Sequence, residues 1–187
     1  MSFFDPAKFT EETIASLKEQ LSGKSIIAAS GGVDSTVAAA LVSKAVGDEL
    51  LAIYVDTGYM RLGESKFVSS MLSELGVKHK VVNASERFYE GLKGIIDPEE
   101  KRKIIGELFI RVFEEESKEY GGKFLVQGTI APDWIESGGG MRDTIKSHHN
   151  VGGLPEDMEM SLCEPIRELY KDEVRSLAEF LDVPVAH

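Results

Sequence analysis

Short apolar segments alternate with segments of helical periodicity along almost the whole chain, and this alternation constrains the fold more than any other feature. Strands are predicted at Ile26–Ala29, Leu50–Val55, Val77–Val82, Phe124–Gln127 and Met160–Cys163. Helices are predicted within residues 1–23, over 37–46, 64–75, 97–120 and 171–181, with a short one near Phe88. Strands joined through helices form right-handed parallel crossovers. The pattern therefore predicts an α/β fold, an open parallel sheet with helices on both faces.

Composition limits the classes of protein that this chain can belong to. Its 187 residues suit a single domain, and its net charge of −11 disfavours a nucleic-acid partner. The longest wholly apolar run, Val37 to Val42, is far shorter than the ~20 residues of a membrane span. A single cysteine, Cys163, excludes an internal disulfide and suits a reducing compartment. We expect a cytoplasmic domain that binds neither membrane nor nucleic acid, with Cys163 in the core.

A glycine-containing loop between the first predicted strand and the following helix is the main candidate for ligand binding. It reads Ser30, Gly31, Gly32, Val33, Asp34, Ser35. Ligands of open parallel sheets bind at the carboxyl ends of strands, and glycines let the backbone approach them closely. Amides at the start of the next helix, with the two serine hydroxyls, would form a cradle for phosphate.

The carboxylate of Asp34 is unusual in such a loop. Beside phosphate it is repulsive unless a divalent cation bridges the two, and Mg²⁺ commonly joins a carboxylate to phosphate oxygens. Asp34 is therefore our candidate Mg²⁺ ligand. The alternative is an ordinary tight turn in which Asp34 or Ser35 caps the helix.

Two common nucleotide-binding fingerprints, G-x-x-x-x-G-K-[ST] and G-x-G-x-x-G after a strand, are absent from the sequence. The loop instead resembles the pyrophosphate-binding loop of the N-type ATP pyrophosphatases, which have an adenine nucleotide alpha hydrolase-like fold. That superfamily activates an oxygen by adenylation and releases pyrophosphate. The loop identifies the superfamily and leaves the member open.

Four further segments narrow the resemblance to the ATP pyrophosphatase domain of the GMP synthetase family. They are Val55 to Arg61, Asp97 to Gly106, Gln127 to Ser137 and Ile145 to Pro155. The resemblance implies conversion of xanthosine 5′-monophosphate (XMP), ATP and ammonia into GMP, AMP and pyrophosphate. ATP and Mg²⁺ are the implied cofactors.

The resemblance also implies roles for individual residues. Val55, Gly128 and Thr129 would flank the adenine of ATP, and Pro132 and Asp133 would lie near the purine of XMP. Asp133 and Glu136 are three residues apart, so on a helical turn both carboxylates face one way. By themselves they are typical of solvated acids at a helix start; the resemblance makes them candidates for catalysis.

Two basic segments have an ordinary and a functional interpretation. Lys101, Arg102 and Lys103 would usually form a solvated helix face, but the resemblance suggests that Arg102 reaches the phosphate of XMP. Lys146 lies in a long glycine-rich loop, predicted at 137–157, and resembles the family's lid lysine, which would neutralise charge on the phosphates. The adjacent His148 and His149 point opposite ways on an extended segment, so we expect no zinc site there.

The resemblance predicts partners and leaves alternatives. The chain lacks a glutaminase domain, so ammonia would come from solution or from a separate glutaminase (glutamine amidotransferase) subunit, as in the two-subunit archaeal type. We expect residues 1–187 to form a single ATP pyrophosphatase domain without the family's C-terminal dimerisation domain, which could be a separate chain. The alternatives are another adenylating enzyme, NAD synthetase-like or tRNA-modifying, and a non-catalytic nucleotide-binding module that docks a glutaminase.

Overall fold

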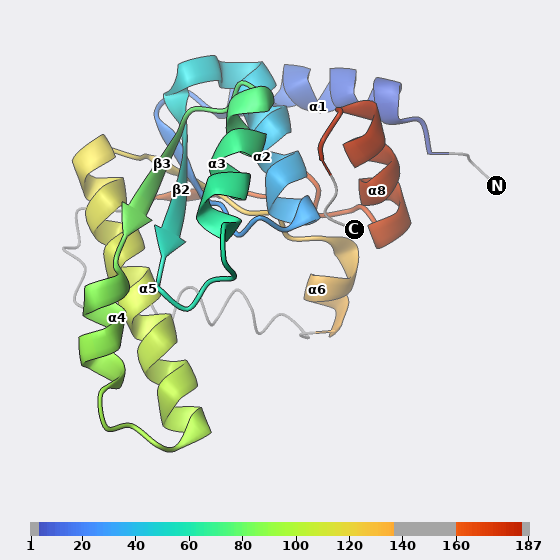
Figure 1. Ribbon diagram of the computed structural model, residues 1–187. Coiled ribbons are helices and arrows are strands. Elements are labelled where there is room, and N and C mark those ends of the chain that lie inside the picture. The colour runs from blue at the N-terminus through green and yellow to red at the C-terminus, as the bar shows by residue number, and fades with distance from the viewer. Residues whose placement is uncertain (1–3, 137–159, 185–187) are drawn as a thin grey trace.

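A single parallel sheet organises the protein, with the strand order β3-β2-β1-β4-β5. The computed structural model describes residues 4–136 and 160–184 (Figure 1). The strands are β1 (Ser25–Ala28), β2 (Leu50–Asp56), β3 (His79–Asn83), β4 (Phe124–Val126) and β5 (Ser161–Cys163). In register, Ser25 of central β1 pairs with Leu50 on one side and Phe124 on the other. The strand order changes direction between β1 and β4, and ligands of such sheets bind at the carboxyl ends beside that point.

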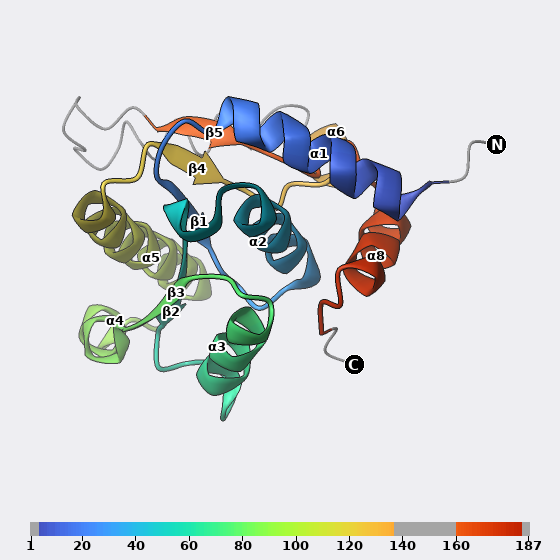
Figure 2. The ribbon, with the colours of Figure 1, turned by 90° about the horizontal axis from the view of Figure 1, so that it is seen from above.

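Helices cover both faces of the sheet, as the sequence predicted (Figure 2). One face carries α1 (Pro6–Gln20), α2 (Val33–Val46), α3 (Glu64–Glu74) and α8 (Lys171–Phe180). The other face carries α4 (Ser85–Leu92) and α5 (Pro98–Tyr120). The short helix α6 (Ala131–Glu136) follows the carboxyl end of β4, and the 3₁₀ turn η1 (Gly47–Glu49) precedes β2.

Alternating side chains of the central strands divide the core into two clusters. Ile27 of β1 and Tyr54 of β2 pack under α2 and α3, whereas Ile26 and Ile53 pack under α5, and all four are at most 1% exposed. Successive side chains of a strand point to opposite faces, so a parallel strand covered by helices on both sides must be apolar throughout. The continuous apolar strand segments therefore encoded the two-sided burial.

Helix boundaries follow the predicted signals with some shifts. Asp5 caps α1 through Ala7 N and Lys8 N, and Asp97 caps α5 through Glu100 N. The helix predicted over 37–46 in fact begins at Val33, because apolar periodicity marks only its buried turns and not the polar first turn. The N-terminal helix ends at Gln20, before the expected stop at Gly23, and β3 begins at His79 rather than at Val77.

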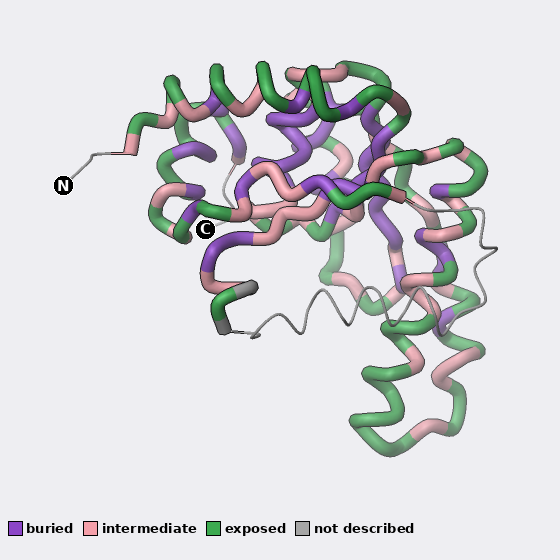
Figure 3. The backbone as a smooth tube through the Cα atoms, turned by 180° about the vertical axis from the view of Figure 1, so that it is seen from behind, coloured by how far each residue is buried: buried purple, intermediate pink, exposed green. Residues whose placement is uncertain are grey.

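The α4–α5 hairpin (residues 85–120) projects beyond the carboxyl edge of the sheet (Figure 1). Its base is packed into the core through Phe88 and Val112. None of the residues from 91 to 111 is buried, and the outer part of the hairpin is largely exposed when seen from behind (Figure 3). The loop predicted at 137–157 lies outside the described residues.

Candidate functional site

The phosphate-loop candidate lies where predicted, between β1 and α2. Gly32 is the N-cap of α2, and no side chain caps this helix end. Gly31 has a φ of +76°, and a Cβ there would lie 2.9 Å from Cγ2 of Val68 in α3. This position therefore requires glycine, both for its left-handed backbone and for its closeness to α3. The alternative interpretation, in which Asp34 or Ser35 caps the helix, is wrong.

Hydrogen bonds within the loop fix its shape while leaving helix amides without helical partners. Ser30 Oγ accepts a bond from Gly32 N at 3.2 Å and lies 3.0 Å from Ser35 Oγ, which donates to Gly32 O at 3.1 Å. The first intrahelical bond of α2 is donated by Thr36 N to Gly32 O. The amides of residues 33–35 precede it and have no carbonyl of a preceding turn to bind. Such amides at the positive end of a helix favour an anion.

A lysine that the sequence analysis missed pairs with the loop. Lys171, the first residue of α8, places Nζ 2.8 Å from both carboxylate oxygens of Asp34. Both side chains are partly exposed, at 41% and 28%. Lysine in the first turn of a helix opposes the helix dipole, and this unfavourable placement was the available sequence signal. The pair brings a cation to the phosphate loop from 137 residues further along the chain.

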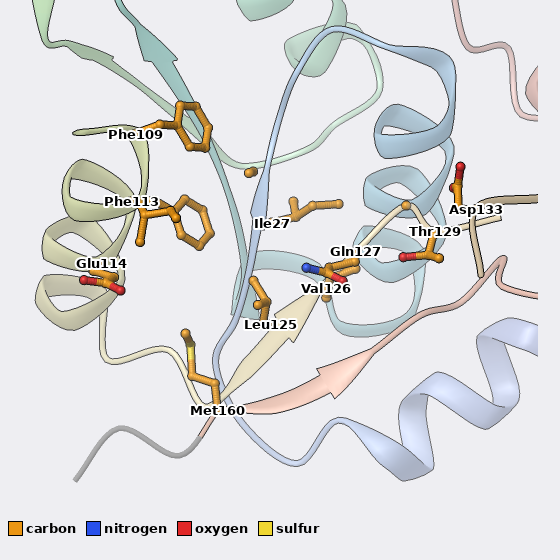
Figure 4. Close-up of a pocket in the computed structure, with 13 residues that line it drawn as sticks. Ile27, Phe109, Phe113, Glu114, Leu125, Val126, Gln127, Thr129, Asp133 and Met160 are labelled. Carbon is orange, nitrogen blue, oxygen red and sulfur yellow. The ribbon is translucent and has the colours of Figure 1, made fainter. Parts of the chain in front are cut away.

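A mostly apolar cavity of about 370 Å³ opens between α5 and the sheet, beside the phosphate loop. Phe109 and Phe113 line it from α5, and Ile27 and Leu125 line it from β1 and β4 (Figure 4). Its polar lining includes Gln127, Thr129 and Asp133, beyond the carboxyl end of β4. This cavity can hold a flat apolar group whose polar edge faces the carboxyl end of the sheet.

Gly128 joins the cavity to the phosphate loop. It lines the cavity, and a Cβ placed on it would lie 2.7 Å from Ser35 N and 2.9 Å from Asp34 O. The structure thus brings together the predicted residues Ser30–Ser35, Gly128 and Thr129. Val55, predicted beside them, is 1% exposed and packs in the core under α4 and α5, so only its backbone remains available to a ligand.

The predicted residues of α6 lie at the carboxyl edge as well. Asp133 lines the cavity, and its Oδ2 accepts a bond from Ile130 N at 2.9 Å. Pro132 precedes it in the same helix, and Glu136 is the last residue of that helix, three positions after Asp133. The helical turn assumed for the two carboxylates is therefore present.

The remaining predicted residues are not part of this cluster. Arg102 lies near the outer end of α5, where its exposed guanidinium pairs with Glu99 at 2.9 Å. Lys146, His148 and His149 lie outside the described residues. Cys163 is buried, as expected, and burial raises the pKa of its thiol to about 11.

The described part of the chain offers no ready-made metal centre. Within it, no group of three or more His, Cys, Asp or Glu side chains could hold a metal ion. A cation at Asp34 would therefore need further donors from a ligand such as a phosphate. In the same described residues, no helix is both long and apolar enough to cross a bilayer.

Comparisons with known proteins agree with this architecture. Residues 24–106 match the family model of the phosphoadenosine phosphosulfate reductase domain. The NMN synthetase from Francisella tularensis superposes with a TM-score of 0.71 at 17% identity, covering 97% of this chain and 73% of that chain. The U34-tRNA thiolase NcsA from Methanococcus maripaludis gives 0.67 at 22%, covering 97% and 66%. The sheet topology and these superpositions thus define an adenine nucleotide alpha hydrolase-like fold.

Sequence similarity is much higher to one group of archaeal proteins. The chain is 56% identical over 179 residues to a subunit of the glutamine-hydrolysing GMP synthase of Pyrococcus abyssi, a match that covers 95% of this chain. It spans 57% of the length of that relative. Over nearly all of its own length, the chain is therefore similar to these GMP synthase subunits.

Proposed function

We propose that this chain carries the nucleotide-activating half of a GMP synthase reaction. In this reaction an oxygen of the xanthine base of XMP attacks the α-phosphorus of ATP. The bond from that phosphorus to the bridging oxygen breaks, pyrophosphate leaves, and the base becomes adenylated. Ammonia then displaces AMP to give GMP. The observation that carries the proposal is the 56% identity to a GMP synthase subunit over 95% of the chain.

The geometry of the phosphate loop supports ATP as the activating nucleotide. Helix amides of residues 33–35 and the hydroxyls of Ser30 and Ser35 can donate to the β- and γ-phosphates, which become the leaving pyrophosphate. Lys171 supplies a positive charge at the same place. Donors that are already fixed before the reaction stabilise the charge that accumulates on a leaving group without a further cost of reorganisation.

Asp34 fits the role of a single carboxylate ligand for Mg²⁺ beside a triphosphate. It stands in the first turn of α2, and its carboxylate is partly exposed and already paired with a cation, Lys171. Mg²⁺ commonly takes one or two protein carboxylates together with phosphate oxygens and water. When bound, the ion would neutralise phosphate charge, and Lys171 would then be free to turn from Asp34 towards the phosphates.

The apolar cavity suits the adenine of ATP. Its phenylalanine side chains offer aromatic faces, and Gly128 and Thr129 connect it to the phosphate loop. We propose that adenine binds in this cavity and contacts the backbone of Val55. Pro132, Asp133 and Glu136 would then orient the second nucleotide at the carboxyl edge, with Arg102 and the loop lysine Lys146 contacting phosphates.

Partners and location follow from the same proposal. The relatives are named as one subunit of a glutamine-hydrolysing enzyme, which supports a separate glutaminase subunit as the source of ammonia. We propose that residues 1–187 form one ATP pyrophosphatase domain. A C-terminal dimerisation domain, in this or another chain, would complete the XMP site. We place the reaction in the cytoplasm. The NAD synthetase-like and tRNA-modifying alternatives have only fold similarity in their favour, at 22% identity or below.

The test is pyrophosphate release with ATP, Mg²⁺, XMP and ammonium, omitting each component in turn. The chain is assayed alone and with a recombinant C-terminal dimerisation domain from a related GMP synthase. We expect release that requires XMP and increases strongly when the domain is added. Release that requires nicotinate adenine dinucleotide or tRNA instead would refute the proposal. ATP binding without release under any condition would indicate the non-catalytic docking module.

A further inference from the structure

The outer part of the α4–α5 hairpin depends on the base of the hairpin for its position. From residue 91 to residue 111 no residue is fully buried (Figure 3), and within this stretch Leu108 and Phe109, next to the base, are the residues that pack against the core cluster under α4 and α5. At the base, Phe88 is fully buried, and Arg87 forms two hydrogen bonds with Glu115, at 2.7 and 2.8 Å. These contacts hold α4 to α5 and to the sheet, but they do not connect the hairpin with the loop that follows β2.

Tyr89 makes that connection. Its hydroxyl donates to Gly58 O at 3.0 Å, and its ring meets the ring of Tyr59 edge-on, with centroids 5.2 Å apart and an interplanar angle of 87°. Gly58 has a φ of +79°, and a Cβ there would overlap the Tyr89 hydroxyl and approach Ser85 Cβ to 2.7 Å. Glycine therefore lets α4 pack directly on the loop backbone.

The amide nitrogen of the same glycine, Gly58, is held from β2. Asp56, the last residue of β2, accepts a bond from Gly58 N at 2.9 Å through Oδ1 and a bond from the hydroxyl of Ser65 through Oδ2. The backbone carbonyl of Asp56 accepts a bond from Ala84 N at 2.9 Å, just before α4. Gly58, which Tyr89 contacts, is thus fixed to the sheet. The hydrogen bond from the Tyr89 hydroxyl to Gly58 O therefore also fixes the hairpin relative to the sheet.

We infer that Tyr89 is a positioning residue that sets the angle of the hairpin relative to the carboxyl edge of the sheet, and thereby the place of Arg102. The inference rests on the proposed function, in which Arg102 contacts the phosphate of the acceptor nucleotide. From the buried Val112 to Arg102, α5 rises about 15 Å at ~1.5 Å per residue. A tilt of about 10° at the base would move Arg102 by about 2.6 Å over that length.

The experiment compares Tyr89→Phe with Tyr120→Phe. Tyr120 is a matched control, because its hydroxyl also donates to a backbone carbonyl, that of Asp48 at 2.8 Å. It is the last residue of α5, at the end of the helix away from Arg102. With turnover measured as pyrophosphate release, Tyr89→Phe is expected to raise the KM for XMP about three- to tenfold, the equivalent of one neutral hydrogen bond. The KM for ATP should change less than twofold. Tyr120→Phe should leave both constants within twofold.

Hydrogen exchange of the nucleotide-free chain gives a second readout that does not depend on activity. Tyr89→Phe should speed exchange in residues 91–111 and at the amide of Gly58, and Tyr120→Phe should not. Unchanged exchange in Tyr89→Phe would overturn the inference, as would equal rises in the two KM values. If the wild-type chain gives no XMP-dependent release even with the added C-terminal domain, the proposed function fails, and the exchange result alone decides whether Tyr89 holds the hairpin.

Discussion

Replacing Gly128 by alanine tests the junction of the phosphate loop and the cavity most directly. A Cβ at this position would lie 2.7 Å from Ser35 N, 2.8 Å from Asp34 C and 2.9 Å from Asp34 O. All three atoms belong to the backbone of the first turn of α2, so no side chain can rotate away. Ordinary contacts of a Cβ begin near 3.4 Å, so the loop or the end of β4 must move by about 0.7 Å.

The expected cost follows from this overlap. Adding a methyl group to a well-packed site costs about 1–3 kcal/mol, which lowers Tm by about 2–12 °C in a domain of this size. The displacement falls on the amides proposed to bind the triphosphate. We therefore expect Gly128→Ala to weaken ATP binding at least tenfold, measured by calorimetry with Mg²⁺.

Gly106→Ala is the matched control, because a Cβ at this position in α5 meets nothing within 4 Å. Alanine in a helix interior should raise stability by about 0.5–1 kcal/mol and leave ATP binding unchanged. If Gly128→Ala kept the wild-type Tm and bound ATP within twofold of wild type, the reasoning about this junction would be refuted.

Three further predictions concern charged and buried groups. Lys171→Gln should weaken ATP binding, measured by calorimetry, about ten- to 100-fold, which is the usual range for a charged hydrogen bond. Lys171→Arg should keep part of the affinity. An equal loss of affinity in the two variants would contradict a role for the positive charge beside Asp34. Hydrogen bonding from Arg87 lowers the pKa of Glu115, so this pair stabilises the fold above the unfolded-state pKa of about 4.3 and loses that effect as pH falls. In Glu115→Gln, Tm should therefore fall less steeply with pH between about pH 5 and 3 than in the wild type. The difference should be small because both side chains are exposed. An unchanged slope of Tm against pH would contradict this role of the pair. The buried Cys163 thiol, with a pKa of about 11, should resist a thiol reagent at pH 8 until the chain is unfolded; rapid labelling of the native chain would show that the site opens.

The predicted strands and helices were largely confirmed because their signals are local. A buried parallel strand must be apolar on both faces, so Leu50–Val55 could be recognised from six consecutive residues. Helix ends with a capping side chain, such as that of Asp97, were also placed correctly. The start of α2 was missed because its first turn faces the phosphate loop and lacks both apolar periodicity and a side-chain cap.

The candidate site was only partly predictable. The phosphate loop is contiguous in sequence, and its glycines and serines indicate its chemistry directly. Val55 was expected to contact a ligand, yet its side chain is in the core, because successive side chains of a strand point to opposite faces and that of Val55 points to the face covered by α4 and α5. Arg102 remains a prediction, since it lies on the exposed outer part of α5 and pairs there with Glu99.

By itself, the sequence determined the fold class, the position of the phosphate loop and, through five motif segments, the resemblance to GMP synthase subunits. These features depend on neighbouring residues or on spacing along the chain. Only the tertiary structure decided which distant residues meet: Lys171 with Asp34, Gly128 with the first turn of α2, and Tyr89 with Gly58. Such contacts depend on how the crossovers bring α4, α8 and the end of β4 to one edge of the sheet. No local pattern encodes that arrangement, because it results from packing the whole chain on both faces of the sheet.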